Sequence, residues 1–148
     1  MFRKQKYAAC QLITAINARI YLGGKDVSDE QFETLVDLVK CRYGGAIEIK
    51  KSYPILGLEY EDGLCRLPWI EANLPIDLTV HSPRFGFHSV LVTEVFYYNN
   101  GYLDIPCLRL LNSDEETLEW HCLYGRIPTW GHQRRCRSFR LAKSKVSC

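Results

Sequence analysis

Three residues of this chain have the types and positions that nucleophilic catalysis requires. Cys10 stands where a polar N-terminal segment gives way to an apolar run, and backbone N–H groups at the first turn of a helix favour a thiolate over a thiol. His88 precedes one predicted strand, and Asn112 follows the next one. In such a set the thiolate attacks a carbonyl carbon, the imidazole takes and returns the proton, and the amide oxygen orients the ring.

Each of these residues has an ordinary structural explanation when it is taken alone. A lone cysteine is often a small buried side chain, a lone histidine at a strand edge often bonds a nearby loop, and Asn-Ser is a common turn pair. The hairpin prediction adds geometry. Residues 89–98 and 102–111 are rich in β-branched and aromatic types, and Asn99-Asn100-Gly101 between them is a turn signal. Antiparallel pairing would place His88 and Asn112 side by side.

The remaining elements predict an α+β fold, with N-terminal helices packed on an antiparallel β-sheet. Apolar residues at three- and four-residue spacing predict a helix over residues 8–22, with one apolar stripe. Ser28 and Gln31 form a capping box, which predicts a second helix that ends before Gly44. Further expectations are a short strand at 46–50, loops over 52–75, a strand at 76–80 and a short strand at 123–127.

Four segments of the second half resemble papain-like cysteine peptidases. That family has a Pro-led strand, a His-Ala-Val-Leu strand, an Asn-Ser dipeptide and a Gly-Tyr-x-Arg-Ile strand in this order. The matching segments here are Pro75–Val80, His88–Val92, Leu110–Ser113 and Tyr124–Ile127. The short chain and the early cysteine are most similar to the papain-fold domains that trim bacteriocin leaders. The resemblance covers residues 5–127 in outline and implies a papain-like fold.

The resemblance also implies roles for individual residues. It makes Cys10 the nucleophile, His88 the general base and acid, and Asn112 the orienting amide, with Gln5 as the oxyanion-hole donor. Gln5 stands one residue closer to the nucleophile than the family's glutamine does. The tryptophan that shields the family's asparagine is replaced by Asp114, which is the alternative third member of the site.

Charge is distributed unevenly along the 148 residues, whose net charge is +2. All 17 Asp and Glu side chains lie before residue 120, whereas the segment after it is basic. We therefore expect a peptidase domain at 1–127 and a basic C-terminal extension at 128–148, a solvated tail that can contact an acidic partner or nucleic acid. Its basic residues include Arg134, Arg135, Arg137, Arg140, Lys143 and Lys145.

Composition excludes several classes of protein. No apolar run reaches the roughly 20 residues of a membrane span, and the N-terminus is too polar for a signal peptide. The seven cysteines are odd in number and scattered, which favours reduced thiols and a cytoplasmic or virion-internal location. One alternative is a zinc site formed by His121, Cys122, His132 and Cys136. The main expectation includes no metal and no cofactor.

Three functions are consistent with these features. The first is a cysteine peptidase that cleaves a peptide or protein substrate through a thioester acyl-enzyme at Cys10. The second is a papain-fold binding or structural module with a degenerate site, which the displaced Gln5 and the missing tryptophan favour. The third is a cell-wall amidase of related fold, since such enzymes also place the cysteine before the histidine.

Overall fold

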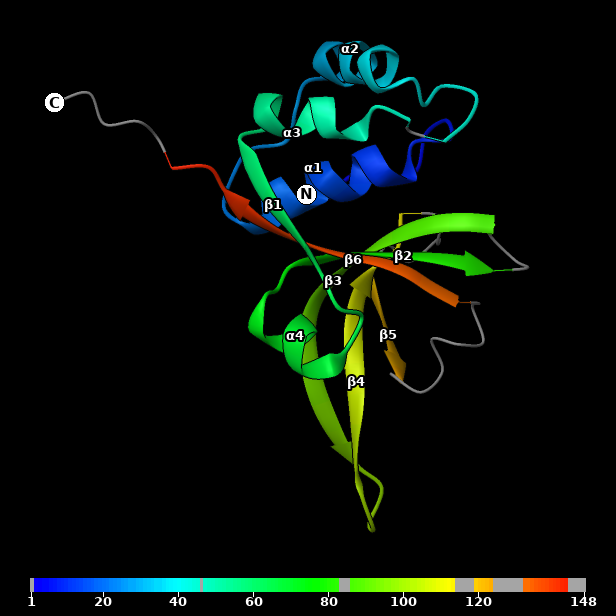
Figure 1. Ribbon diagram of the computed structural model, residues 1–148, viewed down its shortest axis with the longest axis vertical. Coiled ribbons are helices and arrows are strands. Elements are labelled where there is room, and N and C mark those ends of the chain that lie inside the picture. Colours follow the sequence, from blue (N-terminus) through cyan, green and yellow to red (C-terminus); the bar gives the residue numbers. More distant parts are fainter. Residues whose placement is uncertain (1, 46, 83–85, 114–118, 124–131, 144–148) are drawn as a thin grey trace, which may run out of the picture.

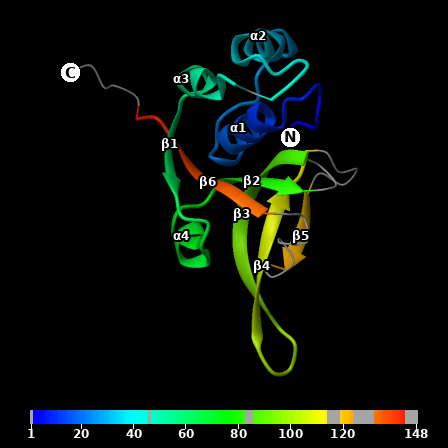
Figure 2. The ribbon, with the colours of Figure 1, turned by 45° about the vertical axis from the view of Figure 1, so that its right-hand side comes forward.

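The computed structural model describes residues 2–45, 47–82, 86–113, 119–123 and 132–143. Three helices, α1 (Cys10–Tyr21), α2 (Asp29–Val39) and α3 (Ser52–Ile55), lie together on one side of a six-stranded antiparallel sheet, and a long hairpin of that sheet projects away from them (Figure 1). Figure 2 shows the same separation from a second direction, with α4 beside the sheet. The predicted α+β fold, with helices packed on an antiparallel sheet, is confirmed.

The first helix, α1 (Cys10–Tyr21), is the centre of the helical layer. Its residues from Leu12 to Ala18 are all buried, so it is enclosed on more sides than the single apolar stripe that its sequence predicts. Two polar residues of this run are accommodated by hydrogen bonds. Thr14 donates to the Ser89 carbonyl oxygen, and Asn17 bonds the backbone of Arg3. The predicted helix itself is confirmed.

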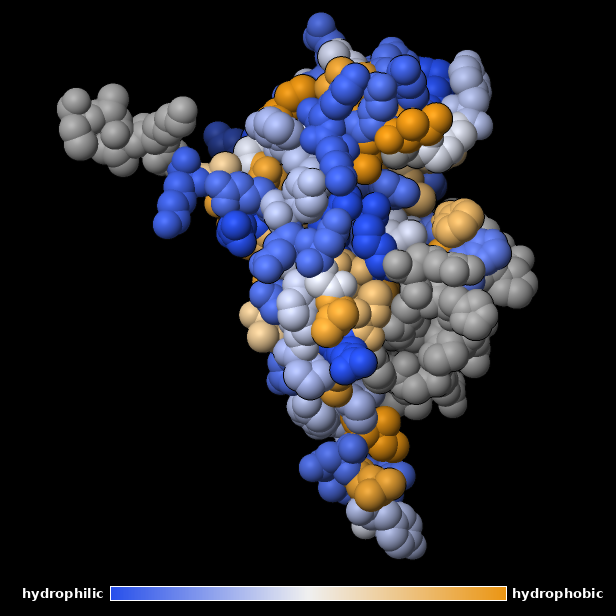
Figure 3. Space-filling model, viewed as in Figure 1, coloured by the Kyte–Doolittle hydropathy of each residue, from blue (hydrophilic) through white to orange (hydrophobic). Residues whose placement is uncertain are grey.

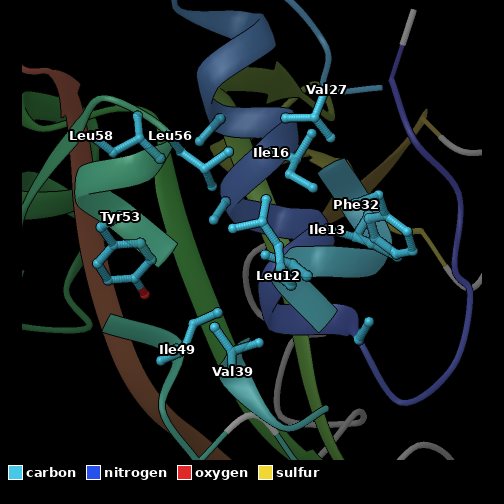
Figure 4. Close-up of a cluster of buried hydrophobic side chains, with 14 of the residues drawn as sticks. Leu12, Ile13, Ile16, Val27, Phe32, Val39, Ile49, Tyr53, Leu56 and Leu58 are labelled. Carbon is cyan, nitrogen blue, oxygen red and sulfur yellow. The ribbon is translucent and has the colours of Figure 1, made fainter. Parts of the chain in front are cut away.

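The second helix, α2 (Asp29–Val39), begins as the capping signal predicts. The Ser28 hydroxyl accepts a hydrogen bond from the Gln31 backbone N–H at 3.0 Å. Its buried side chains, which include Phe32 and Val39, pack against α1 in the core shown in Figure 4. This core also includes Tyr53 of α3.

Two predictions for the middle of the chain are wrong. The strand expected at 46–50 is not formed by its described residues, 47–50, and a 3-10 helix, Ile49–Lys51, begins there instead. Of these four residues only Ile49 is buried, so they lack the alternating burial of a strand. The loops expected over 52–75 contain three elements: α3 (Ser52–Ile55), β1 (Leu58–Gly63) and α4 (Leu67–Ala72). In the sequence, Pro68 is a sign of a loop. In the structure, Pro68 instead lies in the first turn of α4, where a helix makes no hydrogen bond through the backbone N–H that proline lacks.

The sheet has the strand order β1-β6-β2-β3-β4-β5. Its C-terminal strands are β2 (Ile76–Ser82), β3 (Gly86–Asn99), β4 (Asp104–Leu111), β5 (Glu119–Leu123) and β6 (His132–Leu141). The predicted hairpin is β3 and β4, joined at Gly101, which has a φ of +96°. Of the strand expected at 123–127, only Leu123 belongs to β5, and residues 124–127 lie outside the described part of the chain.

The basic segment after residue 127 is not a solvated tail where the structure describes it. Strand β6 lies between β1 and β2 within the sheet. Phe139 is 2% exposed, and the Arg137 side chain is 3% exposed and bonds both carboxylate oxygens of Asp62. Arg140 pairs with Glu59 of the same neighbouring strand. The predicted domain boundary at residue 127 would separate β6 from the sheet to which it belongs. That boundary is therefore wrong for residues 132–141.

The sheet has a hydrophobic core on each face. Leu91, Leu111 and Phe139 belong to the core under α1 and α2, whereas the alternate residues Val90, Val92 and Leu110 belong to a second core with Ile70 of α4. On the face seen in Figure 3, hydrophilic side chains dominate where the helices meet the sheet. In the described residues, no helix is both long and apolar enough to cross a membrane.

Candidate active site

Cys10 is the first residue of α1, and its side chain is partly exposed. Hydrogen bonds from the backbone of Ser89 and Gln11 lower the pKa of its thiol, as the position at a helix start predicts. Burial has the larger effect, and the charge of Asp77 adds to it, so the pKa of Cys10 is raised overall. In the resting protein Cys10 therefore favours the thiol, which differs from the sequence-based expectation.

His88 lies on β3, opposite Val80 of β2, and is 5% exposed. Its Nε2 is 2.7 Å from Oδ1 of Asn112. Because an amide oxygen only accepts hydrogen bonds, Nε2 carries the proton in this contact. In the neutral ring Nδ1 is then the basic nitrogen.

The β3–β4 hairpin produces this contact. Leu91 pairs with Leu111, so Asn112 follows β4 directly and lies near the start of β3. The register shifts between Val92 and Glu94. The proximity of His88 and Asn112 that the sequence predicts is thus present, and their catalytic roles stay a prediction.

The start of α1 lies against the same part of β3. The backbone of Ser89, the residue after His88, lies close enough to the Cys10 thiol to lower its pKa. One helical turn further on, Thr14 donates to the Ser89 carbonyl oxygen at 3.3 Å. Ser89 thus connects the helix that carries the sulfur with the strand that carries the imidazole.

Gln5 lies close to this site and is held by three hydrogen bonds. Its backbone N–H donates to the backbone oxygen of Ser113, the residue after Asn112. Its Oε1 accepts a hydrogen bond from the Ser113 hydroxyl. Its Nε2 donates to the Tyr7 backbone oxygen at 2.9 Å. Because the side-chain nitrogen of Gln5 has two N–H groups, this bond uses one of them and leaves the other for an oxyanion. The oxyanion role of Gln5 stays a prediction.

A buried polar cluster that sequence reasoning missed lies beside Cys10. Asp77 of β2 has a completely buried side chain, and Arg135 of β6 donates to its Oδ2 at 3.1 Å. Thr79 bonds Asp77, Arg135 and the Ser89 hydroxyl. Burial raises the pKa of Asp77, while the neighbouring arginines oppose that shift. A carboxylate inside the alternating apolar strand at 76–80 was the signal for this cluster.

Two alternatives from the sequence involve residues outside the described structure. Asp114 lies outside the described ranges, and so do the side chains of His121, Cys122 and His132. Cys136 is buried beside Cys65, and hydrogen bonding between these two thiols lowers the pKa of Cys65 and raises that of Cys136. No cluster of potential metal ligands is found among the described side chains.

The helical layer, the antiparallel sheet and the placement of Cys10 at a helix start define an α+β, papain-like fold. Comparison with solved structures supports this. The chain is similar to the peptidase domain of ComA from Streptococcus, described as a bifunctional ABC transporter involved in a quorum sensing pathway. The TM-score is 0.69 at 14% sequence identity, over 95% of this chain and 97% of that domain. No model of a known protein family matches the chain, and no curated protein matches it either.

Proposed function

We propose that this protein is a cysteine peptidase in which Cys10 is the nucleophile, His88 the general base and acid, and Asn112 the residue that orients the imidazole. The observation that carries the proposal is the 2.7 Å contact of His88 Nε2 with Asn112 Oδ1. This contact directs the basic Nδ1 away from Asn112. The residue after His88, Ser89, is in turn held by Thr14 to α1, the helix that begins at Cys10.

The first half of the proposed reaction forms an acyl-enzyme. The Cys10 sulfur attacks the carbonyl carbon of the scissile peptide bond while its proton passes to Nδ1 of His88. The resulting oxyanion is stabilised by the Cys10 backbone N–H and by the second N–H of the Gln5 side chain. His88 then gives its proton to the leaving nitrogen, the C–N bond breaks, and a thioester and a free amine remain.

The second half releases the acyl group. His88 takes a proton from a water molecule as the water oxygen attacks the thioester carbon. The C–S bond breaks, the sulfur recovers a proton, and a carboxylic acid leaves. Because burial raises the pKa of Cys10, the base must remove the thiol proton during the attack, so His88 has a larger role here than beside a preformed thiolate.

The experiment is cleavage of a peptide library, prepared from a digested proteome and read by mass spectrometry. We expect cleavage by the unmodified protein and none by Cys10→Ala. His88→Gln should reduce the rate by about 100- to 10,000-fold, the range of general base catalysis. Library cleavage that persists in Cys10→Ala, or that is absent from the unmodified protein, would refute the proposal.

A finer proposal concerns the type of peptidase. The ComA domain is a peptidase domain of a transporter, and its length is nearly matched by this chain. We infer that processing of a leader segment on a peptide precursor is the activity to examine first. Hydrolysis of cell-wall amides is the alternative chemistry for the same residues, and clearing of a cell-wall suspension would identify it.

A second function is favoured by two observations. The raised pKa of Cys10 and the use of one Gln5 N–H by Tyr7 both weaken a peptidase site. They support a papain-fold module that binds peptides without cleaving them. The same library separates the two functions, because a binding module retains peptides on an immobilised column and releases them intact.

A further inference from the structure

A groove of about 600 Å³ opens beside the candidate active site. It begins at Gln11, the residue after Cys10, and lies between the segment that follows α2 and strand β6. Most of its lining side chains are charged. They are Glu48, Lys50, Lys51, Arg135 and Arg137, together with Gln11, Ile47 and Ile49.

The charge of this groove is positive. Four of its lining residues are cationic and one is a carboxylate. That carboxylate, Glu48, is bonded by Lys51 at 3.0 Å and by Lys40 at 3.6 Å. Among the described residues, Lys50 pairs with no carboxylate, and its ammonium group lies 5.5 Å from the centre of the Tyr60 ring.

The arginines differ in how much of their hydrogen-bonding capacity is used. Arg137 donates through Nε, Nη1 and Nη2 to Asp62 and Tyr53. Arg135 donates to Asp77 and Thr79 through Nη2, and its Nε is buried without a hydrogen-bond partner in the described part of the chain. A guanidinium group has five N–H donors, and the two on Nη1 bond no acceptor among the described residues, so Arg135 keeps these for a further acceptor. Its side chain is 25% exposed.

A continuous path of contacts joins Arg135 to the nucleophile. Arg135 bonds Thr79 at 3.2 Å, and the Thr79 hydroxyl bonds that of Ser89 at 2.9 Å. The backbone of Ser89 in turn lies close enough to the Cys10 thiol to lower its pKa. Gln11, the residue after Cys10, lines the groove together with Lys50 and Arg135, so the groove is adjacent to the residue that would hold the scissile bond.

We propose that this groove binds an acidic side chain of the peptide substrate close to the scissile bond, through Lys50 and the unused donors of Arg135. The inference rests on the proposed function, because it names the substrate class of the same site. Carboxylates are the natural ligands of a paired ammonium and guanidinium group, and hydrogen bonds between charged partners are the stronger kind.

The test extends the peptide-library experiment. We expect peptides with Asp or Glu at one fixed position near the cleaved bond to be cut about tenfold faster than those with Asn or Gln there, a factor typical of one charged hydrogen bond. Lys50→Gln should reduce this preference. Lys25→Gln is the matched control, since Lys25 is exposed near the far end of α1, a helix of 12 residues and hence about 18 Å long.

Arg135 needs a more careful substitution, because its loss would leave Asp77 buried without its cation. Arg135→Lys keeps the positive charge and removes the planar fork of donors. We expect Arg135→Lys to fold and to lose most of the acidic preference, which is measured as the ratio of the cleavage rates of acidic and neutral peptides. Far-UV circular dichroism and the melting temperature check the fold.

The outcomes separate this inference from the proposed function. Cleavage without an acidic preference, or a preference that Lys50→Gln and Arg135→Lys leave intact, overturns the groove assignment and leaves the peptidase proposal standing. In the absence of cleavage, immobilised Cys10→Ala protein is loaded with the same library. Selective retention of acidic peptides then supports the groove although the peptidase proposal has failed, and retention without selectivity overturns both.

Discussion

Arg137 provides a quantitative test of the way β6 is built into the sheet. The guanidinium group bonds both oxygens of Asp62 and, at 2.8 Å, the hydroxyl of Tyr53, whose residue is 1% exposed. Arg137→Ala removes these bonds and leaves a buried phenol oxygen without this donor, which costs about 1–3 kcal/mol. Asp62 is 48% exposed, so water restores much of its solvation.

We therefore expect Arg137→Ala to lower the free energy of unfolding by about 3 kcal/mol, at the lower limit of the roughly 3–5 kcal/mol for a fully buried pair. For a chain of this size that corresponds to a decrease of about 6–12 °C in Tm. Arg140→Ala is the matched control, because its side chain is 64% exposed and its pair with Glu59 lies at the surface. Thermal unfolding followed by circular dichroism measures both variants. Equal and small effects would contradict the burial of Arg137 between β6 and its neighbours in the sheet.

Two further predictions concern titratable groups. Because a hydrogen bond from Cys136 lowers the pKa of Cys65 while burial raises that of Cys10, iodoacetamide near neutral pH should label Cys65 faster than Cys10, as read by peptide mass spectrometry; faster labelling of Cys10 would contradict these shifts. Lys6, Tyr7 and Arg42 lower the pKa of Glu33 to about 2, so its contribution to stability is complete above its ordinary pKa of 4.5 and is lost as the pH falls towards 2. Glu33→Gln should flatten this acid dependence in an unfolding titration, whereas an unchanged pH profile would show that Glu33 is unpaired.

The sequence predicted the elements whose signals are local. The capping pair Ser28 and Gln31 and the turn at Gly101 each depend on residues within a few positions of one another, and both are present in the structure. The predicted proximity of His88 and Asn112 followed from hairpin register alone. The hairpin pattern between His88 and Asn112 was thus enough to predict that these two side chains lie together, and the role of Cys10 stays a prediction.

The sequence did not predict what depends on distant pairing. The basic run around Arg137 has the composition of a solvated tail, whereas the carboxylates that Arg137 and Arg140 pair with lie on β1, more than 70 residues earlier. The cluster of Asp77 and Arg135 joins two strands in the same way. Burial likewise decided the pKa of Cys10, and the position at a helix start gave no measure of it.

The most direct test of the proposed site compares the alkylation rate of Cys10 in the unmodified protein and in His88→Gln across neutral pH. If His88 accepts the thiol proton, Cys10 should react about tenfold or more slowly in the variant, while Cys65 in the same sample reacts at an unchanged rate. Equal rates for Cys10 in the two proteins would contradict the pairing of this thiol with the imidazole.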